Sequence, residues 1–536
     1  MSKFKSPSRR TVLLFCGLMS ILLWFSQVTP YLNVADDSGR YMVLGEAIAR
    51  TGDLRLISAP GRPLDTLYPP GFPVIIALCL LITGSKPPGV VILVKVIQLL
   101  LLLCTLPMME RLMKRARLAP LSVNIGLLLY ALSPTLISYA NEVMSEMPLL
   151  FLSLSSVLLV EKSPKSDSDD GHLPSYGKRI LSLALAAIAF TMRTSGIALL
   201  LAQFAWFWKR FGRIWGLIAL SALLLPVGIW LARNHYVAAT HPQIHYATYL
   251  EQFTLRNPMK PGSGRISLSP LGLLSRMKFG IPTYIGMIPR AVLYMMAPPG
   301  SPALMLFYLV AVPLTALIFV GLVEVWRRGL FLSCGFSALF WFTAAMWPWQ
   351  NARFIVPILP FLLLFTMAGS ETAGKWIIQR AGLTAAKLAG CAGMLLILTY
   401  YGSVHLRVIH ADRDMKVYGY RLGRTAAEGG FYSACSWLHA HAAPGSIVMG
   451  KPPYLLHLYS GMTTVQIEPD RSPRNLEIAY IEKERVQYIL EDSWQFGAIS
   501  HRLLGLYFQQ YGNMWRLVWQ DPLGSGVNIW ERTSSF

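Results

Sequence analysis

Residues 178–213 read KRILSLALAAIAFTMRTSGIALLLAQFAWFWKRFGR. The apolar part, residues 181–208, is long enough for one tilted transmembrane helix, but Arg193 stands at its centre. Lysine and arginine flank membrane segments on the cytoplasmic side, and here they flank both ends. The stretch therefore favours a hairpin of two short membrane helices with Arg193 at the outer turn. The alternative is a single helix in which Arg193 snorkels to the interface.

The composition of the whole chain agrees with a membrane protein. Of 536 residues, 54% are apolar and 14% charged, whereas soluble domains carry about 25% charged residues. Together with a mean hydropathy of +0.46, these values exclude a soluble globular protein, a collagen and a disordered chain. Six cysteines are too few and too scattered for a disulfide framework. The net charge of +21 is concentrated beside apolar runs, which favours positive-inside topology over nucleic-acid binding.

Several other apolar runs are long enough, or nearly so, to cross a membrane. The first follows Lys3, Lys5 and Arg9, and no small-residue cleavage site comes after it, so we expect a retained helix that starts in the cytoplasm. The short run 71–84 has no basic flank and is predicted to be re-entrant or to lie in the membrane plane. We expect about eleven to thirteen spans. The first run is 11–29, and the further candidates are 89–107, 121–138, 143–160, 214–232, 303–324, 330–347, 354–369 and 388–404.

This topology places the long polar regions on the outer side of the membrane. The segment 405–536 is charged and punctuated by glycine and proline, with a helical stretch at 431–442, which is typical of a small α/β domain. We therefore predict a polytopic α-helical membrane domain, residues 1–404, with outer loops 30–67 and 233–302. An extracytoplasmic α/β domain, residues 405–536, follows it. Its strand-like runs are 446–449, 488–490 and 528–530.

The first outer loop contains two adjacent carboxylates. Its start, residues 33–41, reads NVADDSGRY, and a helical pattern follows from Met42. Asp37 or Ser38 can therefore cap that helix by accepting backbone N–H groups. The functional alternative is that Asp37 is a carboxylate base at the boundary of membrane and water. The loop closes at Tyr68-Pro69-Pro70-Gly71, a rigid corner that leads back to the membrane.

These motifs, taken in order over residues 10–405, resemble the GT-C superfamily of membrane glycosyltransferases. The resemblance is to the branch of lipid A aminoarabinose transferases and protein O-mannosyltransferases. That branch has an Asp followed four residues later by Tyr, a short helix ending near Gly-Asp, a Pro-Pro corner, a second acidic residue before a Pro, a basic turn, and an Arg-aromatic-x-x-Pro-x-x-Pro pattern. The matching residues here are Asp37, Arg40, Tyr41, Gly52-Asp53, Tyr68-Pro69-Pro70-Gly71, Glu146 with Pro148, Arg193, and Arg353 to Pro360. The lipid A transferases carry lysine where this chain has Tyr68.

The resemblance implies an inverting glycosyltransferase that moves a sugar from a polyprenyl-phosphate carrier to an extracytoplasmic lipid, glycan or protein. It implies a multi-pass protein of a bacterial-type inner membrane, with a cytoplasmic N-terminus. In such a reaction a carboxylate takes the proton of the acceptor, and arginines hold the leaving phosphate. Asp37 and Glu146 are the implied catalytic residues. The implied substrate-binding residues are Asp36, Arg40, Tyr41, Tyr68, Glu142, Arg193 and Arg353.

Several of these residues also have a purely structural interpretation. Arg353 can anchor the membrane interface beside Trp347. Glu142 and Glu146 can form a polar pair that faces water at a helix end. Lys95, inside an apolar run, either snorkels outward or joins the phosphate site, and the sequence leaves both open.

The implied chemistry requires no cofactor, and the sequence contains no zinc, P-loop or dinucleotide-binding motif. Asp36, Asp37 and Glu146 carry oxygen atoms suited to a divalent cation. Two other function classes stay open. A flippase or transporter of lipid-linked glycans predicts charges along the helix centres and inverted repeats. An enzyme similar to O-antigen ligase or polymerase would depend on arginine and histidine of a large loop.

Overall fold

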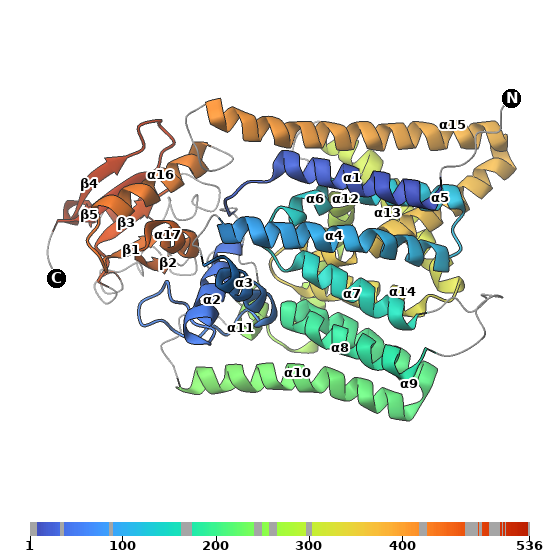
Figure 1. Cartoon of the computed structure of the whole chain (residues 1–536), viewed down its shortest axis with the longest axis horizontal. Helices are drawn as coiled ribbons and strands as arrows, with labels where there is room; N and C mark the ends of the chain where they lie inside the picture. The colour runs from blue at the N-terminus through green and yellow to red at the C-terminus, as the bar shows by residue number, and fades with distance from the viewer. Residues whose placement is uncertain are drawn as a thin grey trace.

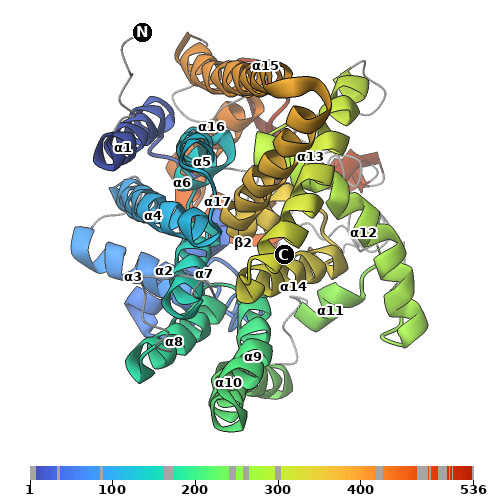
Figure 2. The same ribbon diagram turned by 90° about the vertical axis from the view of Figure 1, so that its right-hand side faces the viewer.

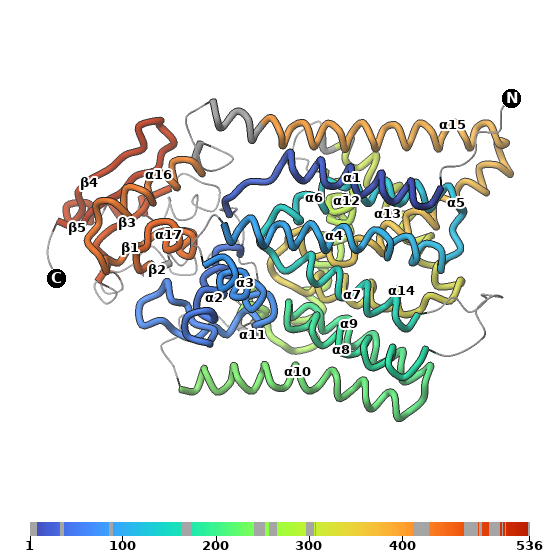
Figure 3. Tube along the Cα trace, viewed as in Figure 1, coloured from blue at the N-terminus to red at the C-terminus, as the bar shows by residue number. Residues whose placement is uncertain are grey.

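The structure is a computed structural model in which a helical bundle carries a small sheet domain at one end (Figure 1). We call residues 426–533 the tail domain and the end of the bundle that it covers the domain end. The first helix, α1 (Arg9–Gln27), begins at the opposite end (Figures 1 and 3). The structure describes residues 8–32, 37–84, 89–161, 174–240, 249–256, 265–295, 303–417, 426–466, 481, 485–492, 504–505, 507–509 and 511–533.

The helices of the bundle are α1 (Arg9–Gln27), α2 (Ser38–Thr51), α3 (Gly71–Thr83), α4 (Gly89–Arg115), α5 (Pro120–Ala131), α6 (Pro134–Ala140), α7 (Glu146–Val160), α8 (Tyr176–Met192), α9 (Ile197–Phe211), α10 (Arg213–Thr240), α11 (Tyr249–Thr254), α12 (Pro270–Leu293), α13 (Ala303–Arg327), α14 (Phe331–Met346) and α15 (Leu359–Val417). Two 3₁₀ segments, η1 (Thr194–Gly196) and η2 (Ala352–Ile358), separate some of them. Figure 2 views the bundle along its length.

Basic residues hold helix ends together at the end opposite the tail domain. Arg9 at the start of α1 lies 2.7 Å from Glu110 near the end of α4. Arg115 donates to the carbonyl of Leu158 at 2.6 Å, and Arg328 donates to a carbonyl of the α4–α5 turn at 2.7 Å. The predicted basic flanks therefore meet at one end of the bundle, as positive-inside topology requires.

Among the described residues, five helices are long and apolar enough to span a membrane, or six if the bent pair α5–α6 counts as one. This number is lower than the number of spans expected from the sequence, because several apolar runs form shorter helices. The helices α3, α7 and α14 are of this kind. The last long helix, α15, turns at Gly382, whose φ of 83° is readily adopted by glycine. Its second half lies along the outside of the bundle (Figure 1).

The predicted hairpin around Arg193 is confirmed. Helix α8 ends at Met192, Arg193 is extended with φ −157° and ψ 136°, and α9 begins at Ile197. Gly196 allows the turn to be tight, because a Cβ there would lie 2.7 Å from the backbone nitrogen of Phe190. The arrangement of α3 also agrees with its prediction, since it lies across the bundle at the domain end and is seen nearly end-on in Figure 1.

Residues 233–302 differ from the outer loop that the sequence predicted. Helix α10 continues to Thr240, and α12 occupies residues 270–293. Tyr284 and Ala291 are buried where α12 packs on α6, α13 and α14. Two prolines and several basic residues interrupt the apolar pattern of α12, and for this reason the sequence predicted a loop there.

The described residues of the tail domain form a five-stranded sheet in the order β2-β1-β3-β5-β4. Strand β1 pairs in parallel with β2 and β3, and β5 is antiparallel to β3 and β4. Helix α15 continues to Val417, past the boundary expected at residue 405. Three strands match predicted runs; β2 and β4 were not predicted. The elements are α16 (Ala426–His441), β1 (Ile447–Gly450), α17 (Pro453–Ser460), β2 (Thr463–Gln466), β3 (Tyr488–Glu491), β4 (Trp515–Gln520) and β5 (Asn528–Arg532).

The tail domain is fastened to the first outer loop. Both backbone groups of Leu32 bond to it: the carbonyl accepts from the Tyr432 hydroxyl at 2.7 Å, and the N–H donates to the Tyr459 hydroxyl at 3.3 Å. The backbone N–H of Thr464 donates to the Ser58 carbonyl at 2.7 Å. Helix α17 also packs closely on α2, since a Cβ at Gly39 would lie 3.0 Å from a side-chain carbon of Leu455. These contacts attach the tail domain to the chain before α2, within α2 and after it.

We expect Tyr432→Phe to lower the free energy of unfolding by about 1–2 kcal/mol, because the ring stays and the buried carbonyl of Leu32 loses a donor. Denaturant unfolding in detergent micelles measures this change. Tyr236→Phe is the control, since Tyr236 is 66% exposed on α10 and its removal should cost less than about 0.5 kcal/mol. Equal stability of both variants would show that the bond to Leu32 contributes nothing.

Candidate active site

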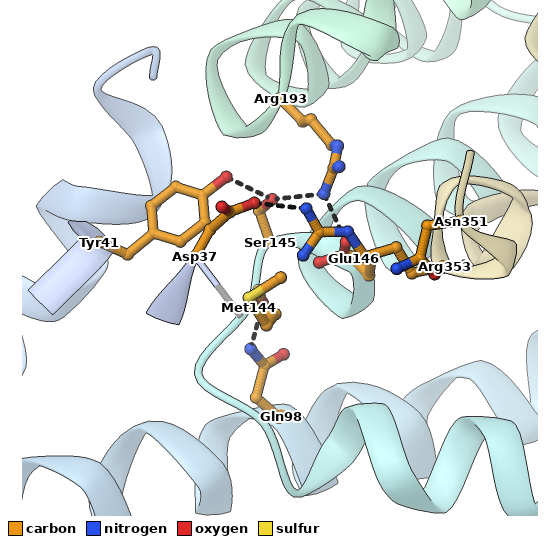
Figure 4. A network of polar contacts seen from close by, with 9 residues as sticks. All are labelled: Asp37, Tyr41, Gln98, Met144, Ser145, Glu146, Arg193, Asn351 and Arg353. Carbon is orange, nitrogen blue, oxygen red and sulfur yellow. Dashed lines mark hydrogen bonds and ion pairs between the residues drawn. The ribbon is translucent and has the colours of Figure 1, made fainter. Parts of the chain in front are cut away.

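Four segments distant in the sequence meet at the domain end of the bundle (Figure 4). Asp37 immediately precedes α2, Glu146 begins α7, Arg193 follows α8, and Arg353 lies at the start of η2. Two ion pairs join them. Arg353 Nη2 lies 2.6 Å from Asp37 Oδ2, and Arg193 Nη1 is paired with Glu146 Oε1. We call these four residues the ion-pair network.

Ser145 links the network to α2. Its hydroxyl oxygen lies 3.0 Å from the Tyr41 hydroxyl and accepts a longer hydrogen bond, 3.5 Å, from Arg193. Figure 4 shows Ser145 between Tyr41 and Arg193. Ser145, which was not predicted from the sequence, thus connects two predicted site residues, Tyr41 and Arg193.

The ring of Phe354 lies close to the guanidinium groups of both arginines. The guanidinium carbon of Arg193 lies 5.1 Å from the centre of the Phe354 ring, and that of Arg353 lies 4.9 Å from it. Cations this close to a ring face are stabilised by its quadrupole. The Phe354 ring therefore stabilises both guanidinium groups, and the two carboxylates neutralise their charges.

The two carboxylates differ in their access to water. The Glu146 side chain is completely buried, whereas 32% of the Asp37 side chain is exposed. Both arginines are largely buried, with 11% and 12% of their side chains exposed. Asp37 is thus the carboxylate of the network that a second molecule can reach.

The surroundings keep Asp37 ionised. Burial alone would raise the pKa of its carboxyl, but the charges of Arg353 and Arg193 and a hydrogen bond from Tyr68 outweigh this effect. The pKa therefore lies below its ordinary value. The capping interpretation is correct for the position of Asp37, which precedes α2, but wrong for its side chain, which makes no hydrogen bond to the helix. Arg353 and Tyr68 take the place of the helix N–H groups.

Tyr68 occupies the position where the lipid A transferases carry lysine. Its ring is 4.6 Å from that of Tyr41 and lies 5.1 Å from the guanidinium carbon of Arg40. The Tyr68-Pro69-Pro70-Gly71 corner is held close to α8, because a Cβ at Gly71 would lie 2.7 Å from the carbonyl oxygen of Thr191. The corner therefore brings Tyr68 beside Asp37 without supplying a cation.

Arg40, expected to bind substrate, is held elsewhere. It forms an ion pair with Asp65, whose other oxygen accepts from the Tyr68 backbone at 3.1 Å. Its guanidinium lies between the rings of Tyr68 and Tyr454, the latter at 5.4 Å and contributed by α17. Arg40 thus connects the first outer loop with the tail domain.

Three residues singled out from the sequence are not members of the network. Asp36 is not among the described residues. Glu142 is buried in the turn before α7. Lys95, buried in α4, donates to the carbonyls of Thr29 and Tyr31 at 2.7 and 2.8 Å and so fixes the chain after α1.

Sequence reasoning missed several residues around the network. Asn351 caps η2 by accepting from the Arg353 backbone at 3.0 Å. Tyr284 of α12, completely buried, donates to the carbonyl of Trp349 at 3.2 Å. Asp65 was missed as the partner of Arg40. Asp65 could have been singled out as a lone carboxylate next to the Pro-Pro corner; the others have no distinguishing local pattern.

Nothing in the described part of the chain groups three or more histidine, cysteine, aspartate or glutamate side chains as a metal would require. Of the oxygen ligands considered from the sequence, Asp37 and Glu146 are each paired with an arginine. Asp36 lies outside the described residues.

No protein-family model and no curated protein sequence matches the chain. The likeness is in the fold, which is that of the GT-C glycosyltransferases, and the chain is a multi-pass membrane protein of this architecture. One similar structure is ArnT from Cupriavidus metallidurans bound to undecaprenyl phosphate. It has a TM-score of 0.59 at 11% identity, covering 98% of this chain and 99% of that one. ArnT in the apo state gives 0.57 at 13% identity, covering 97% and 98%.

A second similar structure is the archaeal oligosaccharyltransferase AglB from Archaeoglobus fulgidus, in complex with an inhibitory peptide and a dolichol-phosphate. It has a TM-score of 0.51 at 11% identity, covering 90% of this chain and 69% of that one. At these identities the likeness concerns the fold alone.

We expect Arg193→Met to destabilise the protein by about 3–5 kcal/mol, because it leaves the buried Glu146 carboxylate without its cation. Adding Glu146→Gln should recover most of that loss, since the amide is neutral. Denaturant unfolding in micelles compares the two variants.

The matched control is Arg516→Met, which breaks an ion pair with Glu531 in the tail domain whose arginine is 69% exposed. Its cost should stay below about 1 kcal/mol. A double variant as unstable as Arg193→Met alone would contradict the expected role of the buried charge.

Proposed function

We propose that the protein is an inverting glycosyltransferase that moves a sugar from a polyprenyl-phosphate carrier to an acceptor hydroxyl. The observation that carries this proposal is the ion-pair network. It offers a partly exposed carboxylate, Asp37, beside two largely buried arginines that share the ring of Phe354. A carboxylate base and a phosphate-binding pair of arginines are the groups that such a transfer needs.

Asp37 is the proposed base. Its exposed fraction makes it accessible to an acceptor, and its lowered pKa keeps it ionised at neutral pH. Glu146 is completely buried and paired with Arg193. These facts support a positioning role for Glu146, which orients Arg193, and they favour Asp37 as the group that meets the acceptor.

In the proposed transfer, all bonds form and break in a single displacement step. The acceptor O–H proton goes to the Asp37 carboxylate while the acceptor oxygen forms a bond to the anomeric carbon. The bond from that carbon to the carrier phosphate oxygen breaks, and its electron pair stays on the phosphate. The phosphate gains charge, which Arg193 and Arg353 stabilise in a poorly solvated site. Direct displacement inverts the anomeric carbon.

The location of the network supports a lipid-linked donor. It lies where the apolar bundle meets the tail domain, so a carrier could keep its tail in the bilayer and its phosphate at the arginines (Figures 1 and 4). Two proteins of the same fold were solved with undecaprenyl phosphate and with dolichol-phosphate. The acceptor class, a lipid, a glycan or a protein, depends on the loops around the network.

The proposed location is a bacterial-type inner membrane, with the tail domain and Asp37 on the extracytoplasmic side. The clustering of basic helix ends at the opposite end supports a cytoplasmic N-terminus.

We expect Asp37→Asn to lower the transfer rate about 10²–10⁴-fold, the usual loss for a general base, while the polyprenyl carrier still binds. Asp36→Asn should lose much less. Transfer from a radiolabelled carrier-linked sugar in proteoliposomes measures both.

Asp53→Asn serves as a further control, because Asp53 is a partly exposed carboxylate of the same loop that pairs with Arg55. Wild-type activity of Asp37→Asn would favour the transporter or ligase classes. Equal losses at Asp36 and Asp37 would mean that the base is assigned to the wrong residue.

We expect Tyr68→Phe to shift the acidic limb of the pH–rate profile to higher pH. The base works only when ionised, and the Tyr68 hydrogen bond helps to lower the pKa of Asp37, so its loss raises that pKa. Rates of wild type and Tyr68→Phe between pH 3 and 7 compare the two limbs. A limb that moves to lower pH, or does not move, would show that Tyr68 does not stabilise the ionised base.

A further inference from the structure

The proposed phosphate-binding arginines are both engaged with carboxylates. Arg353 Nη2 lies 2.6 Å from Asp37, and Arg193 is paired with Glu146. The network holds two positive and two negative charges, so it has no net charge. A carrier phosphate can gain a full ion pair here only by taking an arginine from a carboxylate that already holds it.

The two arginines differ in what their departure would cost. Glu146 is completely buried, so the loss of Arg193 would leave a charged group in a medium that does not solvate it. Asp37 is 32% exposed, so water can solvate its carboxylate when Arg353 turns away. Exchange of partners is therefore far less costly at Arg353 than at Arg193.

The surroundings of Arg353 allow its guanidinium to move while its backbone stays fixed. The backbone N–H is held by Asn351 at 3.0 Å at the start of η2, and residues 355–358 that follow are buried. The Phe354 ring, 4.9 Å from the guanidinium carbon, offers a face on which the cation can pivot. Arg193 lies over the same ring, which places it beside any anion that Arg353 turns towards.

We propose that Arg353 is exchanged between two anions during each cycle. In the ligand-free protein it holds Asp37; when the polyprenyl-phosphate donor binds, it turns to the phosphate and releases the Asp37 carboxylate to the acceptor hydroxyl. This inference rests on the proposed function and adds to it the order in which the steps occur. The donor binds first, and only then is the base free to accept a proton.

The proposed exchange predicts that one substitution in the site strengthens phosphate binding, whereas an ordinary binding-site substitution weakens it. Asp37→Asn removes the competing charge, so Arg353 is available to the phosphate at once. We expect undecaprenyl phosphate to bind this inactive variant about 2–5-fold more tightly than it binds the wild-type protein, the value of a partly exposed ion pair. Arg353→Gln should weaken binding, and Asp37→Asn should bring no gain when Arg353 is already glutamine.

The experiment measures the dissociation constant of undecaprenyl phosphate for the full chain in lipid nanodiscs, by titration of intrinsic tryptophan fluorescence. Asp53→Asn removes a carboxylate from the same loop and controls for the general loss of negative charge. The unfolding temperature of every variant is compared, so that a misfolded protein is recognised.

Each outcome decides one question. Affinity of Asp37→Asn equal to or weaker than that of the wild type overturns the exchange. An equal gain in Asp53→Asn also overturns it, because the effect would then be a long-range one. Wild-type affinity in Arg353→Gln removes Arg353 from the phosphate site. A wild-type protein that binds no undecaprenyl phosphate contradicts the proposed function itself.

Discussion

The ion pair between Asp37 and Arg353 is the interaction on which the domain end of the bundle depends. It joins residues 316 positions apart and connects the first outer loop to the segment before α15. Each charge stabilises the other in this place, and the pairing matters most for Glu146 and Arg193, because the Glu146 side chain is completely buried. Mutual neutralisation therefore allows four charged side chains to lie at the edge of a membrane domain. It also draws α2, α7, α8 and η2 together, since one of the four residues lies in or next to each of them.

Much of the architecture could be predicted from charge and periodicity. The basic ends around residues 178–213 predicted the α8–α9 hairpin, because two cytoplasmic flanks require an even number of crossings. Elements with mixed composition were missed. Helix α12 contains prolines and basic residues that interrupt its apolar face, and α15 continues beyond residue 405 in polar sequence. Strand β4 is an edge strand that contains an arginine, so its alternation is weak.

The candidate site, like the fold, could be predicted only in part from the sequence. The residue types and their order along the chain singled out Asp37, Glu146, Arg193 and Arg353, but not which carboxylate pairs with which arginine. That pairing depends on how α2 sits against η2 and how α7 sits against α8, which one sequence does not specify. Tyr68, at the position where the lipid A transferases carry lysine, illustrates this limit of prediction from sequence. The sequence indicated a lost cation, whereas the structure has a tyrosine whose hydroxyl stabilises the ionised Asp37.

The contacts between the tail domain and the first outer loop have a consequence for biosynthesis. Leu32 bonds to Tyr432, 400 residues later, and Ser58 bonds to Thr464, 406 residues later. A ribosome that adds roughly 5–20 residues per second needs tens of seconds to make the chain between such partners. During that interval Leu32 and Ser58 have left the ribosome without the groups that will bond to them. Asp37 consequently reaches its final setting late, after the whole bundle has been inserted and the tail domain has folded onto it, so a truncated or stalled chain is left with an incomplete site.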